Sequence, residues 1–448
     1  MLFSNKELKK LILPLVLEQF LVILVGMIDM IMVSGVGEAA VSGVSLVDNI
    51  NILIINISAA MATGGAVVVG HFLGQKDTEN AGRAAWQLIF FSTIVAAIIS
   101  VCLVVWHKPL LRLIFGQVEE AVMSSAVTYM TITAISITPL AVYNSCAAIF
   151  RAMNSAKTTM WISIFMNIVH VTVNSILIYG VKIGVAGAAI STTISRTLAA
   201  AIILYLLLDP NKLINIKGKV TWKINGELIK KILYIGIPNG MENSLFQLGK
   251  IMLLSLISTF GTYAMAANAV CNTLAGFNIL PGQAINLALL SVAAVCVGAG
   301  DYKQTRYYTK KLLVLAIACT GAISLLLLIF APWIMKIYNL SSEAEVLAVR
   351  VIRYHAAMAV LLWMPSFTTP NTLRAAGDVV WTMVIAIGSM WTFRILTAYA
   401  FSNYFELGLM GVWIAMTIDW AFRAICYEYR FHGCKWEHCM TEKIEHSG

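Results

Sequence analysis

One carboxylate, one imidazole and two amides have the types and spacings of a site that binds a cation or relays a proton. Asn167, His170 and Asn174 follow an i, i+3, i+7 pattern, which places them on one face of a helix. Asn174 stands about 9 Å below the end of its apolar run. Asp29 stands about 6 Å below the matching end of another run. Oxygen ligands suit a hard cation, and an Asp–His pair suits a proton.

Two hydroxyls fall at a comparable depth. Thr192 and Thr193 lie about 10 Å inside the next apolar run. The expected chemistry is therefore coupling to Na⁺ or H⁺, with a Na⁺ ion at Asp29 as the only expected metal and no other cofactor. Simpler roles stay open: packing for the hydroxyls, interhelical hydrogen bonds for the amides, and an ion pair with Arg196 for the carboxylate.

Two further glutamates occupy matching places. Glu18 and Glu242 each follow a proline by four residues, near the inner end of an apolar run. We expect them to line the mouth of a substrate cavity, although pairing with loop lysines is an equal alternative. The other cavity candidates are Met27, Asp48, Trp363 and Phe367. Bundle packing is the alternative for the apolar members, and a solvated or helix-capping role is the alternative for the aspartate.

The composition shows which elements must position these side chains. Hydrophobic residues make up 59% of the 448 residues and charged residues only 12%, against about 45–50% and 25% in soluble domains. The mean hydropathy is +0.82. This composition excludes an ordinary soluble enzyme and a disordered chain, and it predicts an all-α polytopic membrane protein.

We place twelve transmembrane helices. They cover residues 11–33, 46–70, 84–106, 124–150, 159–180, 186–208, 232–258, 266–298, 310–332, 347–370, 379–401 and 408–430. Pro281 and Gly282 are expected to break the eighth. Most of the 31 lysines and arginines then fall on one side, which predicts that both termini are cytoplasmic in a plasma-membrane protein. The net charge of +9 is therefore read as loop charge and not as a nucleic-acid site.

The chain repeats itself. Pro238 follows Pro14 by 224 residues, and the same offset relates Glu18 to Glu242 and further pairs across six spans. Six is even, so the two copies form a parallel repeat, two six-helix lobes related by a pseudo-two-fold axis along the membrane normal. The predicted organisation is an N-lobe at 1–208, a cytoplasmic linker at 209–231, a C-lobe at 232–430 and a cytoplasmic tail at 431–448. This arrangement is typical of alternating-access transporters.

Motifs of enzymes and ATP-driven exporters do not occur. The sequence contains no GxxxxGK[ST], no HExxH and no GxSxG. We therefore expect a transporter that is not an enzyme and that draws its energy from a gradient.

Several segments resemble the multidrug and toxic compound extrusion (MATE) family of bacteria. They are residues 14–33, 70–77, 150–154, 184–190, 298–301 and 373–378. The resemblance implies a cation-coupled antiporter that exports drugs or other amphiphilic, often cationic, organic molecules. In the family, an N-lobe cation site uses a first-span Asp, here Asp29, and a fifth-span Asp preceded by an Asn. Those last two positions hold Asn174 and His170 here, so one carboxylate is lost and a titratable group is gained.

Two other functions stay open at this point. A flippase of lipid-linked precursors would belong to the same superfamily, but it would need a strongly basic cavity. A membrane sensor that transports nothing is disfavoured by the repeat and by the intramembrane carboxylate. The expected partners are small organic substrates and the lipid bilayer, and we expect a monomer.

Overall fold

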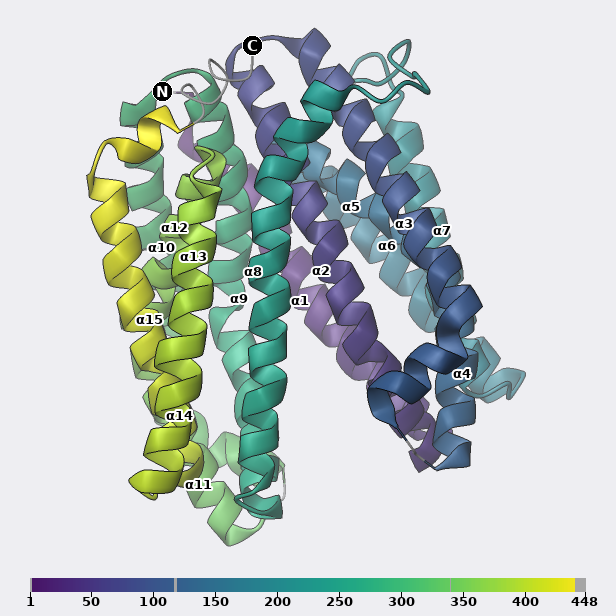
Figure 1. The fold of residues 1–448 in the computed structure, drawn as a ribbon, viewed down its shortest axis with the longest axis vertical. Helices are drawn as coiled ribbons and strands as arrows, with labels where there is room; N and C mark the ends of the chain where they lie inside the picture. The colour runs from purple at the N-terminus through teal and green to yellow at the C-terminus, as the bar shows by residue number, and fades with distance from the viewer. Residues whose placement is uncertain (1, 117–118, 339, 440–448) are drawn as a thin grey trace. The chain divides into compact units, whose positions relative to one another are not determined.

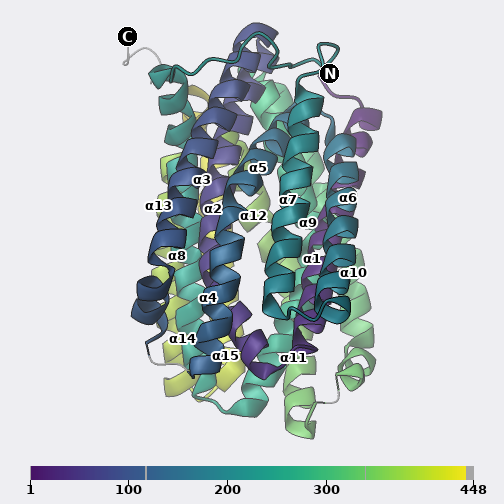
Figure 2. The same ribbon diagram turned by 90° about the vertical axis from the view of Figure 1, so that its right-hand side faces the viewer.

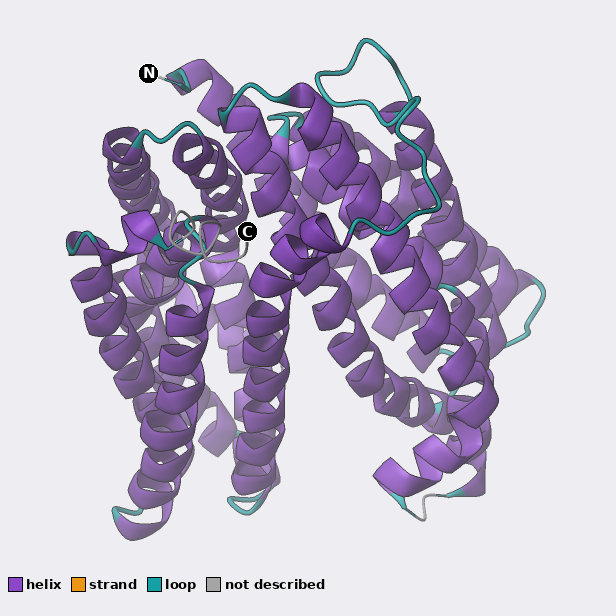
Figure 3. Ribbon diagram, turned by 45° about the horizontal axis from the view of Figure 1, so that its top comes forward, coloured by secondary structure: helices purple, strands orange, loops and turns teal. Residues whose placement is uncertain are grey.

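The structure is a computed structural model that describes residues 2–116, 119–338 and 340–439. Over these residues the secondary structure is helical, and short loops join most helix ends, with one long loop between Leu207 and Gly226 (Figure 3). The first half contains α1 (Asn5–Ser34), α2 (Glu38–Gly74), α3 (Thr78–Phe115), α4 (Glu120–Ile135), α5 (Ile137–Ala152), α6 (Ala156–Ser175), the π-helical turn η1 (Ile176–Gly180) and α7 (Val185–Leu207).

The second half repeats this order. It contains α8 (Gly226–Ser258), α9 (Thr262–Gly298), α10 (Tyr302–Ile337), α11 (Ser342–Met358), η2 (Ala359–Trp363), α12 (Met364–Ala375), α13 (Val379–Ser389), η3 (Met390–Leu396), α14 (Thr397–Tyr399), η4 (Ala400–Tyr404), α15 (Gly408–His432) and η5 (Lys435–His438). Helices α2 and α9 are each 37 residues long. The predicted tail at 431–448 is described only as far as residue 439.

Within the described residues, ten helices are long and apolar enough to cross a membrane, and the α4–α5 pair, bent by 46°, adds an eleventh. Helix α8 is not among them, and it carries both Glu242 and Lys250. It corresponds to the predicted seventh span, so each predicted span has a helical counterpart.

Two boundaries differ from the prediction. Pro281 lies inside the continuous helix α9, so the expected break at Pro281 and Gly282 is wrong. Neighbouring helices satisfy the backbone of a membrane-spanning helix that contains proline. Helix α2 begins at Glu38 and not at residue 46, because Gly37 starts it with a φ of 138°, which glycine adopts readily. Asp48 therefore lies three turns inside the helix and not at its start.

The repeat is visible in how the helices begin. The Asp77 side chain accepts a hydrogen bond from the Asn80 backbone N–H at 2.9 Å, and Asp301 accepts one from the Gln304 N–H at 2.9 Å. Both aspartates are N-caps, of α3 and α10. These backbone hydrogen bonds, together with hydrogen bonds from the Asn80 and Gln304 side-chain amides, lower the pKa of both carboxyls below the usual range.

The chain divides into two compact units. One is Ser4–Gly240, and the other is Met1–Phe3 with Met241–Gly448. In the first, α1 packs along α6, and α6 lies beside α7 (Figure 2). Part of the predicted linker also packs in this unit, because Trp86 Nε1 donates to the Thr221 carbonyl at 2.9 Å. In the second, α13 lies beside α15 (Figure 1).

Candidate functional site

A polar cavity of about 350 Å³ lies inside the unit Ser4–Gly240. Helices α1, α2, α4, α6 and α7 all contribute side chains to its wall. The ionisable and polar side chains in the wall are Asp29, Asp48, Asn51, Tyr129, Thr133, Asn167, His170, Thr192, Ser195 and Arg196. A cavity of this size admits an ion with water or one small organic group.

Asp29 and His170 are in direct contact in this cavity. His170 Nε2 lies 2.7 Å from Asp29 Oδ1 and 2.8 Å from Oδ2. Asn174, one turn further along α6, donates from Nδ2 to Asp29 Oδ1 at 2.8 Å. The Asp29 side chain is 34% exposed, whereas that of His170 is 8% exposed. The carboxylate is therefore open to the cavity while its imidazole partner is held by the surrounding helices.

The amides leave two buried polar atoms without hydrogen-bond partners in the structure. They are Asn174 Oδ1 and Asn167 Nδ2. A buried polar atom without a partner is costly, so such atoms mark places where water or a bound ion is expected. The carboxylates and amides that line the cavity and carry oxygen atoms are Asp29, Asp48, Asn51 and Asn167. The described residues contain no group of three His, Cys, Asp or Glu side chains arranged to hold a metal ion.

The opposite wall carries charges of both signs. Asn51 Nδ2 lies 3.4 Å from Asp48 Oδ1, and Asp48 lines the same cavity as Asp29. Arg196 does not pair with Asp29. Its Nη1 donates instead to Ser136 Oγ at 2.8 Å, at the bend between α4 and α5. The bent pair thus holds this arginine in place.

The other predicted residues of this unit lie apart from the Asp29–His170 contact. Thr192 lines the cavity and donates to the Ala188 carbonyl at 2.9 Å, whereas Thr193 donates to the Ile132 carbonyl at 3.2 Å and is absent from the wall. Met27 is 41% exposed and is also outside the wall, where Met30 contributes instead.

The two glutamates related by the repeat have partners related by the repeat. Glu242 accepts from Arg374 Nη2 at 2.7 and 2.8 Å. Arg151 Nη1 lies 3.9 Å from Glu18 Oε1, and Thr159 donates to Glu18 Oε2 at 3.1 Å. The partners are therefore arginines at the C-terminal ends of α5 and α12 and not loop lysines. The sequence contained the signal, since both arginines precede an alanine in matching places.

Trp363 and Phe367 form part of an aromatic cluster in the second unit. Their rings stack with centroids 4.8 Å apart, and Phe246 meets Phe367 edge-on at 6.5 Å. Trp363 is only 5% exposed. Beside the cluster, Asp419 accepts from Arg423 Nε at 2.9 Å, as an i, i+4 pair on α15 predicts. A second cation that the sequence spacing does not indicate, Arg394, places its Nε 3.1 Å from Asp419 Oδ2.

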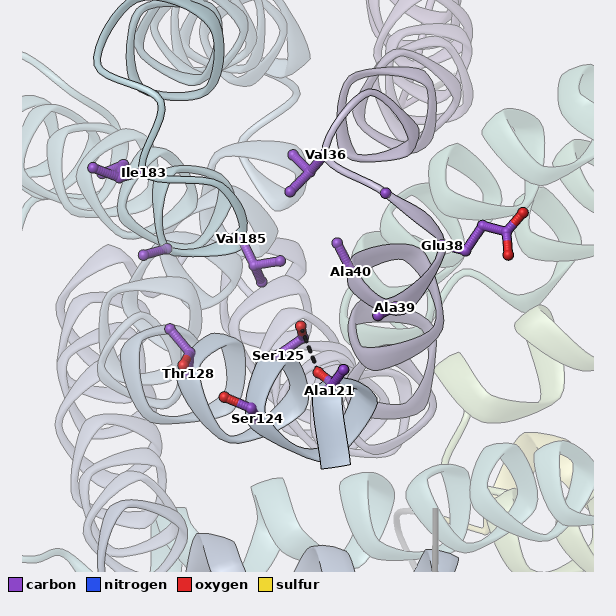
Figure 4. Close-up of a pocket in the computed structure, with 12 residues that line it drawn as sticks. Val36, Glu38, Ala39, Ala40, Ala121, Ser124, Ser125, Thr128, Ile183 and Val185 are labelled. Carbon is purple, nitrogen blue, oxygen red and sulfur yellow. Dashed lines mark hydrogen bonds between the residues drawn. The ribbon is translucent and has the colours of Figure 1, made fainter. Parts of the chain in front are cut away.

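A second cavity of about 430 Å³ lies at the N-terminal ends of α2, α4 and α7. Small side chains line it, among them Ala40, Ser125 and Val185 (Figure 4). The one charged residue in its wall, Glu38, points away from it (Figure 4). Among the lining residues, no charged side chain points into this cavity, so the Asp29 cavity is the stronger candidate.

Comparison with known proteins gives the family. The MatE family pattern matches residues 14–176 and 238–400, one copy in each half of the chain. The probable multidrug resistance protein NorM of Thermotoga maritima is 25% identical over 438 residues, which cover 97% of this chain and 93% of NorM. An uncharacterized transporter of Bacillus subtilis, YisQ, is 27% identical over 432 residues, 94% of this chain and 93% of its own length.

The fold agrees with solved structures. One described as the outward-facing conformation of a multidrug resistance MATE transporter of the MOP superfamily matches with a TM-score of 0.89. It is 22% identical, and the match covers 95% of this chain and 96% of that one. The helix order, the duplicated family pattern and this match agree with one another. The chain belongs to the MatE family and is therefore a multi-pass membrane transporter and not an enzyme.

Proposed function

We propose that this protein is a proton-coupled antiporter that exports organic amphiphiles, and that the Asp29–His170 pair carries the coupling proton. The observation that supports this most strongly is the contact between His170 Nε2 and both carboxylate oxygens of Asp29, at 2.7 and 2.8 Å. The multidrug resistance name of the Thermotoga relative supports drug-like substrates.

The donor set favours a proton over Na⁺. A sodium ion needs oxygen ligands arranged around it, and imidazole nitrogen is a poor ligand for a hard cation. His170 Nε2 occupies the space in front of both Asp29 oxygens, and the Asn174 amide N–H₂ contacts Oδ1. A carboxylate in contact with an imidazole forms a pair that can hold a proton on the ring as well as on the carboxylate.

The coupling step follows from charge. With a neutral imidazole and an ionised carboxylate, the pair carries one negative charge, and uptake of one proton neutralises it. The pair lies among apolar helices, where a change of one charge has a large energetic effect. A conformation in which the cavity is more polar favours the ionised pair, and a drier conformation favours the neutral one. Proton binding therefore shifts the balance between two conformations of the transporter.

The expected setting is the plasma membrane, with both termini in the cytoplasm, as the lysine and arginine distribution favours. Protons would then reach Asp29 from the outer side and drive substrate outward.

The test is transport by Asp29→Asn protein reconstituted in liposomes with an imposed proton gradient. Ethidium and carboxyfluorescein serve as cationic and anionic probes. We expect the variant to move neither probe above the level of empty liposomes, because an amide cannot carry the proton. Glu38→Gln is the matched control. This carboxylate is exposed and points away from the second cavity, in whose wall it lies (Figure 4). Wild-type transport by Asp29→Asn would refute the proposal.

A further inference from the structure

The aromatic cluster of the second unit has more positive charge around it than the carboxylate among those cations neutralises. Three cations surround the Phe246 ring: Lys250 Nζ at 5.2 Å, the Arg394 guanidinium at 4.8 Å and the Arg423 guanidinium at 5.3 Å from its centroid. The carboxylate among them is Asp419, which both arginines share. Glu242, one turn before Phe246, is already held by two contacts with Arg374. The cluster therefore carries an excess of two positive charges.

The three cations differ in how well they are satisfied. Arg423 has hydrogen bonds to Asp419, to Ser389 Oγ and to the Ala386 carbonyl. Arg394 is 3% exposed, and among the described residues neither of its Nη atoms has an acceptor. Lys250 has no ion pair or hydrogen bond within those residues either, and its side chain is exposed. Two cationic groups on neighbouring helices thus keep free donors beside one aromatic ring.

Depth places these groups within the apolar layer. Lys250 lies eight residues before the end of α8, about 12 Å along the helix. Arg394 lies ten residues before the end of η4, about 15 Å along its segment. Gly249 allows close packing here, since a Cβ on it would lie 2.2 Å from the Met390 side chain of η3. Unpaired charge at such depth is costly and is usually retained because it acts on a ligand.

The repeat shows that this polarity belongs to one half of the chain. Arg394 stands one residue beyond the counterpart of His170, because α6 and α13 begin 223 residues apart, at Ala156 and Val379. Between α1 and α8 the repeat offset is 224 residues. It pairs Asp29 with Leu253, and Gly26 with Lys250. The first half therefore has a carboxylate where the second half has a leucine, and a glycine where the second half has a lysine. The duplicated framework has diverged into one unit suited to protons or cations and one suited to anions.

We propose that Lys250 and Arg394 form a binding site for the anionic group of an amphiphilic substrate, a carboxylate or a phosphate, with Phe246 and the stacked Trp363–Phe367 pair receiving its apolar or aromatic part. Cationic donors bind such groups through charge-assisted hydrogen bonds, and aromatic faces bind planar apolar groups. The site deepens the transport proposal by naming the charge of the substrate, but it involves a different unit and different residues from the coupling pair.

Calorimetric titration of the purified full-length protein in detergent tests the site without any gradient. The probes are 1-naphthoate and 1-naphthylmethylammonium, which share a ring system and differ in charge. We expect 1-naphthoate to bind more tightly. Lys250→Met should weaken it about tenfold, as loss of a charge-assisted contact does. Lys250→Arg should retain binding, and thermal unfolding should confirm that both variants fold.

Lys311→Met is the matched control. Lys311 also lies over an aromatic ring, that of Tyr307 at 5.3 Å, but both of these residues are on α10 and not on α8. Equal binding of 1-naphthoate by wild type and Lys250→Met, or tighter binding of the ammonium probe, would overturn the site. Dioctanoyl phosphatidic acid distinguishes a lipid headgroup from a soluble anion as the natural ligand. If it displaces 1-naphthoate in a manner that depends on Lys250, the site accepts a lipid headgroup. If 1-naphthoate binds and phosphatidic acid does not displace it, the site is selective for a soluble anion. A negative result in this binding experiment would not affect the transport test with Asp29→Asn, and a negative transport test would not affect the binding experiment.

Discussion

His170 Nε2 lies within 2.8 Å of both carboxylate oxygens of Asp29, although 141 residues separate the two in the chain. The contact joins α1 to α6, which pack along each other. Both side chains line the cavity, and the carboxylate is the more exposed of the two, at 34% against 8% for the imidazole.

Replacing His170 with glutamine separates a titrating role from a structural one. Glutamine keeps a hydrogen-bond donor for Asp29 but binds no proton near neutral pH. We expect the rate of proton-driven efflux to fall at least about tenfold, in line with loss of general acid–base groups, and its dependence on pH between 5 and 8 to change shape. The measurement is a pH profile of efflux in proteoliposomes. An unchanged profile would show that His170 only positions Asp29.

The Glu242–Arg374 pair predicts an effect on stability. Glu242→Gln leaves a buried guanidinium without its charge partner, which costs about 3 kcal/mol or more. Thermal unfolding in detergent should show a clearly lower midpoint. The double variant Glu242→Gln/Arg374→Met should recover part of the loss, since it removes the orphaned charge.

Glu18→Gln provides the comparison from within the repeat. Arg151 stands 3.9 Å from Glu18, whereas Arg374 lies 2.7 Å from Glu242. The effect of Glu18→Gln should therefore be smaller than that of Glu242→Gln. Equal effects would show that the two ion pairs contribute alike despite their different geometry.

The helix caps predict a pH dependence. The pKa values of Asp77 and Asp301 are lower in the folded protein than in the unfolded chain, so each ionised carboxyl favours the folded state. This contribution is present above the unfolded pKa of about 4 and is lost as the pH falls through the lower folded pKa. Asp77→Ala/Asp301→Ala should lower the thermal midpoint at pH 7, and the difference from wild type should shrink at pH 3. A difference that stays constant with pH would contradict the capping role.

Much of this architecture could be predicted from local information. Apolar runs located the spans, and the fixed offset between Pro14 and Pro238 revealed the repeat. Residues on one helix face, such as His170 and Asn174, could be grouped because helix geometry fixes their spacing. Their position opposite Asp29 followed from comparing depths, since residues at one depth on packed helices meet.

Other features depended on contacts that spacing does not encode. Asp48 is a predicted cavity residue and does line the cavity, but its place three turns inside α2 was not predicted, because α2 begins eight residues earlier than its hydropathy indicates. Arg394 reaches Asp419 from the π-helical turn η3, where an extra residue rotates the side chains relative to a regular helix. No periodicity argument locates such a turn, so the cluster around Phe246 emerged only with the three-dimensional structure.

The central claim is that protons, received by the Asp29–His170 pair, drive transport. The direct test is efflux of ethidium and carboxyfluorescein from liposomes that contain wild-type protein, under an imposed proton gradient without Na⁺ and, separately, under a Na⁺ gradient at equal pH on both sides. The account predicts that the proton gradient alone drives efflux and that the Na⁺ gradient does not. Efflux driven by Na⁺ alone would contradict it and would instead make Asp29, with the amide oxygens around it, a sodium site.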